Sequence, residues 1–413
     1  MTFRRAFAPL LLLAAFACGA TDDASDSTTV DEPKPNDPAS STTSSTSSTS
    51  STKSAELPAL GSTTNERASG SVDLAGAAPG ASSGAGDPGA PAPEAVPAVP
   101  ALPKQLHGVN LTGAEFSYTA IPGLEGKDYG WPTHAEVDYF RGKGMNTFRV
   151  GFLWERMQAK AFGELTSSYV TKLDDLVAYA TSKGAVVILN PHNFARYYGV
   201  SVGSATVPAS AFADLWKRLA ARHAQNPRVI FNLVNEPNGL PTEQWVEAAN
   251  AAIAAIRGAG ATNLVHVPGN AWTGAHSWNE SWYGTSNAKA MLDIVDPANN
   301  SVFEVHQYLD ATSGGQTGDC VSKTVGRERL AGFVSWLRAH GKKGFVGEFA
   351  GGNNATCNAA VTDMLNAMDE ASDVLVGWLW WAAGPRWNPS YAFSIEPKDG
   401  HDAPQMSLLT PYL

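Results

Sequence analysis

From about residue 104 onward, short apolar runs alternate with longer stretches in which apolar residues recur every three or four positions. The short runs are nearly continuous in Val, Ile, Leu and Phe, which is typical of parallel strands buried on both faces. They predict strands at residues 107–111, 147–152, 185–190, 229–235, 263–267, 302–306, 345–349 and 374–380. The longer stretches predict helices at residues 133–141, 168–182, 209–223, 243–257, 287–294, 327–340 and 358–371.

The order of these elements predicts the fold class. Gly184, Gly258 and Gly341 follow the ends of three expected helices, where glycine commonly stops a helix. Strand starts recur roughly every 40 residues, a period that also occurs in helical and propeller repeats. The units share no common signature, however, and strand alternates with helix throughout. Eight strand–helix units in about 310 residues therefore predict an α/β fold, a (β/α)₈ TIM barrel with a short last helix.

The first hundred residues follow a different pattern. Residues 40–54 are almost wholly Ser and Thr, and residues 75–103 are mostly Ala, Gly and Pro. All 12 Trp lie between Trp131 and Trp387. Without aromatic surface or a periodic apolar face, such a segment cannot offset the entropy of ordering its chain. We expect residues 18–103 to be a disordered linker ahead of one folded domain at residues 104–413.

The start of the chain has the features of an export signal. Two arginines precede residues 6–17, an apolar run that is too short to span a bilayer. We therefore expect residues 1–17 to be a signal peptide. Cys18 follows directly and resembles the cysteine of a bacterial lipoprotein box, although Ala15 and Phe16 depart from that pattern. We favour a lipid anchor at Cys18, with a plain secreted protein as the alternative. In both cases the protein is extracellular or on the cell surface.

The charge balance argues against several classes of partner. The chain has 29 basic and 39 acidic residues, a net charge of −10, of which −6 falls on residues 1–103 and −4 on residues 104–413. Nucleic acids and anionic lipid surfaces call for a basic patch, so neither is expected as the main partner. The nine His form no H-E-x-x-H pattern and the three Cys lack zinc-site spacing. We expect no metal, no other cofactor and a monomeric protein.

Polar and aromatic residues gather where the expected strands end, which is where a barrel of this type has its active site. They are Arg149, His192, Asn235, Glu236, His306, Tyr308, Glu348 and Trp381. Glu236 taken alone fits a structural role as well as a functional one. Two glutamates at non-adjacent strand ends, within a ring of donors and aromatic side chains, favour catalysis.

Paired carboxyl groups across a cleft suit the hydrolysis of glycosidic bonds. One carboxyl is protonated and donates to the leaving oxygen, while the other is ionised and attacks the anomeric carbon. Their proximity separates the two pKa values, because like charges resist ionising together. We expect Arg149 and Tyr308 to stabilise the ionised carboxylate. Once a glycosyl-enzyme has formed, the first carboxyl acts as a base toward water.

Several motifs occur in the order in which they stand in a known family. Asn235-Glu236-Pro237 follows an apolar strand and resembles the acid/base signature of glycoside hydrolase family 5. The other motifs are Ile121-Pro-Gly-Leu-Glu-Gly-Lys-Asp-Tyr129, Gly144-Met-Asn-Thr-Phe-Arg149, Trp154-Glu-Arg-Met157, Pro191-His-Asn-Phe-Ala-Arg-Tyr-Tyr198, Gly269-Asn-Ala-Trp-Thr-Gly274, Val305-His-Gln-Tyr-Leu-Asp310 and Gly347-Glu-Phe-Ala-Gly-Gly352. Together, over roughly residues 105–413, they resemble the secreted endo-β-1,4-glucanase branch of that family.

The resemblance implies a role for each residue of the ring. Glu236 is similar to the general acid/base and Glu348 to the nucleophile of a double displacement that retains the anomeric configuration. Arg149 and Tyr308 resemble the residues that orient the nucleophile, and Asn235 resembles the donor to the sugar 2-hydroxyl. The remaining roles are polar walls beside the cleavage point for His192 and His306, and a stacking floor for Trp381.

Sugar rings pack against aromatic faces, so tryptophans near the rim are candidate subsites. We favour Trp272 together with Trp381. Other candidates in or near the same loops are Trp131, Trp154, Trp278, Trp282 and Trp387, whereas Trp216, Trp245 and Trp336 fall inside helix patterns and are expected in the core. The resembling branch also implies a disulfide between Cys320 and Cys357.

Three functional interpretations remain open at this stage. The first is internal hydrolysis of β-1,4-glucan, with a β-glucan polysaccharide or oligosaccharide as the partner. The second is a related β-1,4-glycanase acting on mannan, xyloglucan or mixed-linkage glucan, since the catalytic ring would be the same. The third is a non-catalytic carbohydrate-binding envelope protein, which the retention of both glutamates disfavours.

Overall fold

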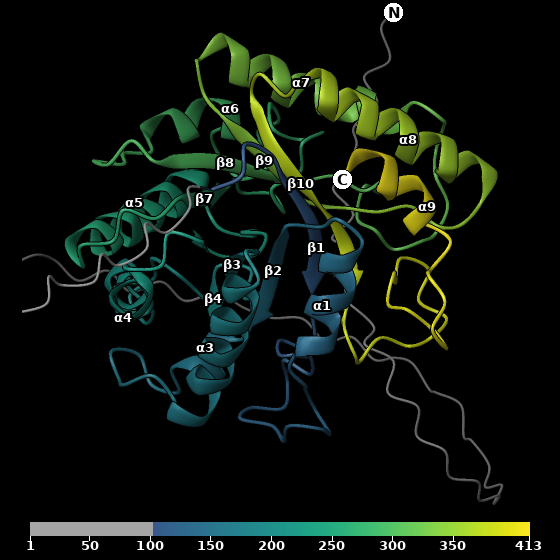
Figure 1. Cartoon of the computed structure of the whole chain (residues 1–413). Helices are drawn as coiled ribbons and strands as arrows, with labels where there is room; N and C mark the ends of the chain where they lie inside the picture. Colours follow the sequence, from purple (N-terminus) through teal and green to yellow (C-terminus); the bar gives the residue numbers. More distant parts are fainter. Residues whose placement is uncertain (1–101) are drawn as a thin grey trace, which may run out of the picture. The chain divides into compact units, whose positions relative to one another are not determined.

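A computed structural model describes residues 102–413, which form a closed barrel of parallel strands surrounded by helices (Figure 1). The strands follow one another around the barrel in the order β1-β10-β9-β8-β7-β6-β3-β2. Their bounds are β1 Leu106–Leu111, β2 Thr147–Phe152, β3 Val186–Pro191, β6 Val229–Asn232, β7 Val265–Pro268, β8 Ser301–His306, β9 Gly344–Phe349 and β10 Leu375–Ala383. The predicted (β/α)₈ fold is confirmed.

The helices form the outer layer. Their bounds are α1 His134–Gly142, α2 Trp154–Met157, α3 Ser167–Ser182, α4 Ala209–His223, α5 Thr242–Gly258, α6 Asn287–Ala290, α7 Val325–Ala339, α8 Ala355–Glu370 and α9 Met406–Leu409, with 3₁₀ turns η1 Met291–Asp293 and η2 Thr410–Tyr412. Figure 1 shows α7 and α8 side by side next to β9 and β10. Within residues 102–413, no helix is both long enough and apolar enough to cross a bilayer.

Local sequence explains how individual helices begin. Thr133 caps α1, because its hydroxyl accepts from the Glu136 backbone N–H while the Glu136 carboxylate accepts from the Thr133 N–H. Asn354 caps α8 in a similar way by accepting from the Cys357 N–H. These side chains satisfy backbone donors that a helix leaves unpaired at its first turn.

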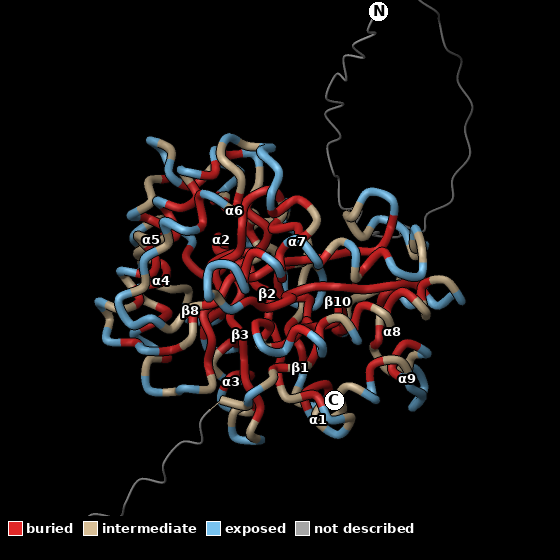
Figure 2. Tube along the Cα trace, turned by 90° about the horizontal axis from the view of Figure 1, so that it is seen from above, coloured by how far each residue is buried: buried red, intermediate tan, exposed pale blue. Residues whose placement is uncertain are grey.

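The barrel strands are buried on both of their faces, which explains their unbroken apolar runs (Figure 2). One apolar cluster fills the space between strands and helices and includes Trp216, Trp245 and Trp336, as predicted. A second, smaller cluster consists of Leu106, Val186, Ile188, Ile230, Val302, Phe345 and Leu379. Its members alternate along the strands with those of the first cluster, so they plug the barrel interior at the end where the strands begin.

Three predicted elements differ from the structure. Strand β6 ends at Asn232, not at residue 235, because Asn235 leaves the regular ladder to hydrogen-bond Pro191 O across the sheet. Strand β10 runs on to Ala383, since Ala383 still pairs with Leu111. The single helix expected at residues 287–294 is instead the one-turn α6 followed by η1.

Two small elements were not predicted from the sequence. A two-stranded hairpin, β4 Arg196–Tyr197 and β5 Val200–Ser201, rises from the loop after β3, and the one-turn α2 follows β2 directly. Each is too short to leave a periodic pattern. Both lie at the end of the barrel where the strands terminate, so they add to the rim around the candidate site.

The disulfide predicted between Cys320 and Cys357 is present, with Cα atoms 5.2 Å apart. It ties the long loop after β8 to the first turn of α8. Other sequence-based predictions fall on residues 1–101, namely the signal peptide at 1–17, the lipid anchor at Cys18 and most of the linker at 18–103. They lie outside the described residues.

Candidate active site

The ring of residues predicted from the strand ends comes together at one end of the barrel. Arg149, His306, Glu348 and Trp381 lie on β2, β8, β9 and β10, respectively. The others follow directly after strands: His192 after β3, Asn235 and Glu236 after β6, and Tyr308 after β8. All of them are buried or nearly buried. Half of the ring therefore lies on the barrel strands and half just beyond their ends, and strands hold side chains more precisely than mobile loops do.

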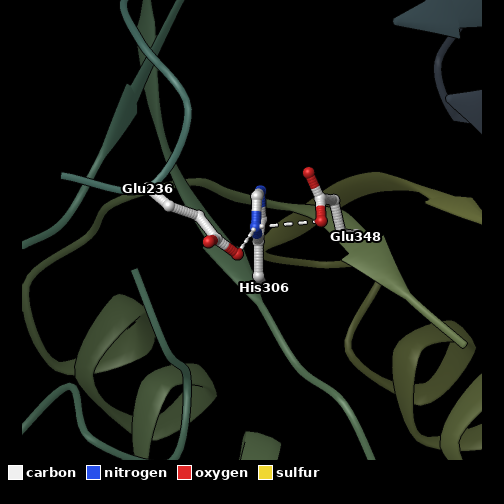
Figure 3. Close-up of side chains that lie close together, drawn as sticks. All are labelled: Glu236, His306 and Glu348. Carbon is white, nitrogen blue, oxygen red and sulfur yellow. Dashed lines mark hydrogen bonds and ion pairs between the residues drawn. The ribbon is translucent and has the colours of Figure 1, made fainter. Parts of the chain in front are cut away.

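His306 lies between the two carboxyl groups (Figure 3). Its Nδ1 is 2.8 Å from Glu236 Oε1 and 3.4 Å from Glu348 Oε2. One carboxylate oxygen of each glutamate and a ring nitrogen of His306 all lie within 4.8 Å of one another. In retaining glycosidases the two carboxyl groups are only about 5–5.5 Å apart, whereas inverting enzymes leave about 6.5–9.5 Å for a water molecule. The spacing matches direct attack by one carboxylate.

Glu348 is held by a donor on each oxygen. Arg149 donates from Nη1 to Oε1 at 2.8 Å, and the Tyr308 hydroxyl donates to Oε2 at 2.7 Å. Both donors are buried, and the Arg149 side chain is only 1% exposed. Charge-assisted bonds of this kind favour the ionised carboxylate and fix its orientation.

Arg149 also organises the neighbouring amides. It donates to Asn110 Oδ1 at 2.8 Å, to Asn235 Oδ1 at 2.7 Å and to Asn232 Oδ1 at 3.2 Å. Asn235 in turn donates from Nδ2 to His192 Nε2 at 3.1 Å. A guanidinium group has a rigid fork of donors, so one side chain fixes three amides and a carboxylate at once.

The backbone turns sharply to present Glu236. Its φ is 43°, in the left-handed region that non-glycine residues seldom adopt. The Glu236 carbonyl accepts from Asn238 Nδ2 at 3.0 Å, and the next carbonyl, that of Pro237, accepts from the Trp272 N–H at 3.0 Å. These bonds hold a conformation that would otherwise be unfavourable, a feature that clusters at functional sites.

Burial and neighbouring charges set the ionisation of the site. Burial raises the pKa of Glu348, and Glu236 raises it further, while His306, Arg149 and Tyr308 pull it down. Burial opposes the charge on His306, but Glu348, Glu236 and Glu304 outweigh it and raise the pKa of His306 to about 9. His306 is therefore an imidazolium near neutral pH, placed between two carboxyl groups.

His192 is the opposite case. Burial lowers its pKa well below the ordinary value, and Arg149 and His306 lower it further because they are positive. A neutral imidazole agrees with its hydrogen bonds, in which Nε2 accepts from Asn235 and Nδ1 lies 3.1 Å from Asn190 Oδ1. The site thus contains one charged and one neutral histidine, and their environments explain the difference.

Trp381 forms an aromatic wall beside the carboxyl groups. Its ring stacks on His192, with centroids 5.6 Å apart and planes 26° apart, and meets Trp387 edge-on at 6.0 Å. The indole N–H donates to the Tyr391 hydroxyl at 3.0 Å. These three neighbours fix the orientation of the ring, and its use as a surface for the apolar face of a sugar stays a prediction.

The structure separates the other tryptophan candidates. Trp272 is partly exposed, its backbone supports the Glu236 turn and its ring neighbours Tyr283 at 6.0 Å, so its use as a subsite stays a prediction. Trp282 is 50% exposed. Trp154 and Trp278 were wrong candidates, because both are fully buried among other aromatic rings and cannot reach a substrate.

Four further polar residues are buried in the barrel interior near the site and were not predicted to belong to it: Asn110, Asn232, His266 and Glu304. Asn110 donates to Gly347 O and accepts from Arg149, and Glu304 lies beneath His306. The sequence contained a sign of two of them, because Glu304 and His266 interrupt otherwise apolar strands. A polar or charged residue buried at such a position needs partners.

In residues 102–413 the one cluster with three metal-ligating side chains is Glu236, His306 and Glu348. His306 Nδ1 is within ion-pair distance of both carboxyl groups, and the arrangement suits proton transfer and carboxylate attack.

Comparisons with known proteins agree with this geometry. Residues 107–384 match the model of the family Cellulase (glycosyl hydrolase family 5). The chain is 43% identical over 298 residues to Endoglucanase gh5-1 of Neurospora crassa, covering 71% of this chain and 73% of that protein. It is 42% identical over 294 residues to Endo-beta-1,4-glucanase B of Emericella nidulans, covering 71% of this chain and 86% of the relative.

Solved structures show the same likeness. XacCel5A, determined in complex with cellopentaose, is 48% identical with a TM-score of 0.74, over 75% of this chain and 99% of that chain. The endo-beta-1,4-glucanase Xac0029 from Xanthomonas axonopodis pv. citri is 49% identical with a TM-score of 0.74, over 75% and 98% of the two chains. Barrel, site geometry and relatives agree, and the chain belongs to glycosyl hydrolase family 5.

Proposed function

We propose that this protein is an endo-β-1,4-glucanase, a hydrolase that cuts β-1,4-glucan chains internally with retention of configuration. The observation that carries the proposal is the short distance between the Glu236 and Glu348 carboxylate oxygens, within the 4.8 Å of their cluster. That spacing leaves room for an anomeric carbon next to Glu348 but not for a water molecule between both carboxyl groups and the sugar. Relatives named as endo-β-1,4-glucanases supply the substrate class.

In the first step, a Glu348 oxygen bonds to the anomeric carbon as the bond to the leaving sugar breaks. Glu236 gives its proton to the leaving oxygen, so the departing sugar ends with a hydroxyl group. Arg149 and Tyr308 orient the attacking carboxylate through its two oxygens. We assign Asn235 as the donor to the sugar 2-hydroxyl, and its hydrogen bonds with Arg149 and His192 support a fixed orientation of its amide.

In the second step, Glu236 is a carboxylate and removes a proton from water. The water oxygen bonds to the anomeric carbon, and the bond to Glu348 breaks, which restores both carboxyl groups. During this cycle the negative charge moves from Glu348 to Glu236. His306 touches both groups, so its positive charge stabilises whichever of them is ionised.

The test is an assay of the purified protein on carboxymethyl cellulose, barley glucan, xyloglucan and mannan. We expect the glucans to be cut with a fast fall in viscosity, as internal cleavage requires. Glu236→Gln and Glu348→Gln should each reduce kcat by at least about 1,000-fold, because each removes a group that makes or breaks a bond in the transition state. Undiminished activity in either variant would exclude the assigned roles, and mannan as the sole good substrate would exclude a glucanase.

We also propose that the protein acts outside the cell, exported by residues 1–17 and held at the surface through a lipid on Cys18. The basic start, the apolar run and the cysteine after Ala17 support this proposal. Fractionation of cells that express the full chain tests it. Wild type should be found with membranes, and Cys18→Ala should be released into the medium; equal retention of both would exclude the anchor.

A further inference from the structure

A buried glutamate–histidine pair that plays no direct part in the chemistry lies beneath the catalytic carboxyl groups. Glu304 on β8 and His266 on β7 both have 0% of their side chains exposed. They occupy the barrel interior between the apolar plug and the active site. Burying an isolated carboxylate is expensive, so a fully buried glutamate at this place calls for a physical explanation.

Glu304 has three cationic or ionisable partners, each from a different position around the barrel. His266 Nδ1 lies 3.0 Å from Oε2, while Arg149 Nη2 and His306 Nε2 each lie 3.4 Å from Oε1. Arg149 also pairs with Glu348, and His306 also pairs with Glu236. The Glu304 carboxylate is thereby connected to Glu348 through Arg149 and to Glu236 through His306.

The backbone makes room for this carboxylate. Gly347 precedes Glu348 on β9, and a Cβ atom at that position would come within 2.6 Å of Glu304 Cδ and 2.7 Å of its Oε1. Any larger residue before Glu348 would displace Glu304 from Arg149 and His306. The glycine of the Gly347-Glu348 motif is thus required by the layer beneath the site.

The neighbours of Glu304 favour its ionised form. Burial raises the pKa of Glu304, but Arg149, His266 and His306 outweigh it and hold the pKa far below its usual range. Around His306 the titratable groups are the carboxyl groups of Glu236, Glu348 and Glu304, with Arg149 and neutral His192 nearby. When Glu348 becomes an ester in the glycosyl-enzyme, its charge disappears, while the charge of Glu304 persists.

We propose that Glu304, oriented by His266, is a positioning residue that holds His306 and Arg149 in place beside the catalytic carboxyl groups through both steps of the reaction. It does not touch the substrate. Its effect reaches Glu236 through His306 and Glu348 through Arg149. The inference rests on the proposed function for its kinetic consequences, but its electrostatic consequence, a proton held on His306, exists without any substrate.

The experiment compares Glu304→Gln with wild type in the full chain. Gln keeps the shape and removes the charge. We expect the pKa of His306, measured by NMR of the ring in the free enzyme, to fall by about one unit or more. On soluble β-glucan, kcat should fall about tenfold or more while KM changes less than about threefold, and the alkaline limb of kcat/KM should move to lower pH.

Two further variants address His266. His266→Asn retains a donor toward Glu304 and should keep most of the activity, whereas His266→Leu removes the donor and should approach the Glu304→Gln value. The matched control is Asp296→Asn, which breaks a buried ion pair with Arg257 at 2.8 Å far from the site. It should lower the thermal midpoint and leave kcat and the pH profile unchanged.

The outcomes separate the two proposals. A wild type without β-glucanase activity would exclude the proposed function, and the NMR titration would still decide the role of Glu304. An unchanged His306 pKa and an unchanged alkaline limb in folded Glu304→Gln would overturn the positioning role. If Glu304→Gln does not fold, His266→Leu is the variant that tests the proposal. A wild-type kcat and a wild-type pH profile in His266→Leu would then overturn it.

Discussion

Arg149 donates a 2.8 Å hydrogen bond to Glu348 across the barrel, from a side chain that is 1% exposed. The two residues stand 199 positions apart in the chain, on β2 and β9. A rigid fork that also holds Asn110, Asn232 and Asn235 leaves the guanidinium group no freedom to follow a displaced carboxylate. The orientation of the proposed nucleophile is consequently set by the whole barrel.

Replacing Arg149 by Lys should therefore damage catalysis rather than binding. An ammonium group keeps the charge but cannot serve Glu348 and three amides at once, so we expect kcat to fall about 100-fold with little change in KM. Steady-state kinetics on a cello-oligosaccharide measures this effect. Arg257→Lys, at a buried ion pair away from the site, is the control and should keep wild-type kcat. Equal kcat in Arg149→Lys and wild type would contradict the role.

The pH dependence of kcat/KM should show the environment of Glu348. Its pKa is raised by burial and by Glu236, and the reaction needs it ionised. Activity should therefore fall on the acid side at a pH above about 4.3, the ordinary value of a glutamate. Tyr308→Phe removes a donor that favours the ionised form, so the acid limb should move further up. An acid limb below that value, or one that Tyr308→Phe shifts downward, would disagree with this prediction.

A second carboxyl pair, Glu136 in α1 and Glu396 in the loop after β10, should make stability depend on pH. Burial and the nearby Glu136 raise the pKa of Glu396 to about 7. A raised carboxyl pKa in the folded state means that stability is lost as pH rises from about 4.3 through 7. Glu396→Gln should thus gain about 1 kcal/mol over wild type at pH 8, after allowance for solvent screening, and nothing at pH 4.

Thermal unfolding at pH 4, 6 and 8 measures that difference. Glu136 also caps α1, so the informative variant is at position 396, where the carboxylate accepts from the Gly384 N–H at 2.9 Å and shares a side-chain hydrogen bond with Glu136. A difference between Glu396→Gln and wild type that stays the same across this range would show that the two carboxyl groups do not interact.

The Cys320–Cys357 bond should contribute to stability and not to the chemistry. It closes a loop with a sequence separation of 37, for which chain entropy predicts a contribution of about 4 kcal/mol. Cys320→Ala combined with Cys357→Ala should lower the thermal midpoint by several degrees while kcat on soluble β-glucan stays within about twofold. A large loss of kcat at a temperature where the variant is folded would instead give the loop after β8 a catalytic role.

Much of the fold and of the site was predictable because it depends on local pattern. Parallel strands buried on both faces need continuous apolar runs, whereas in helices apolar residues recur every three or four positions. The order of the eight strand–helix units could therefore be predicted from the sequence. The barrel then brings all strand ends to one rim, which places Glu236 and Glu348 together whatever their distance in sequence. The ring from Arg149 to Trp381 follows from this single geometric rule.

The tertiary structure decided what no local pattern contains. Trp154 at the start of α2 and Trp278 in the loop after β7 both follow barrel strands, yet their rings are fully buried, because burial depends on neighbours from other units. The turn at Glu236 and the pairing of Glu136 with Glu396 likewise depend on contacts between distant segments. In the sequence, Glu304 and His266 are only polar residues within predicted strands. The closed barrel brings them together beneath His306. Sequence thus determined the elements and the rim, and packing decided which charges meet and hence how each group ionises.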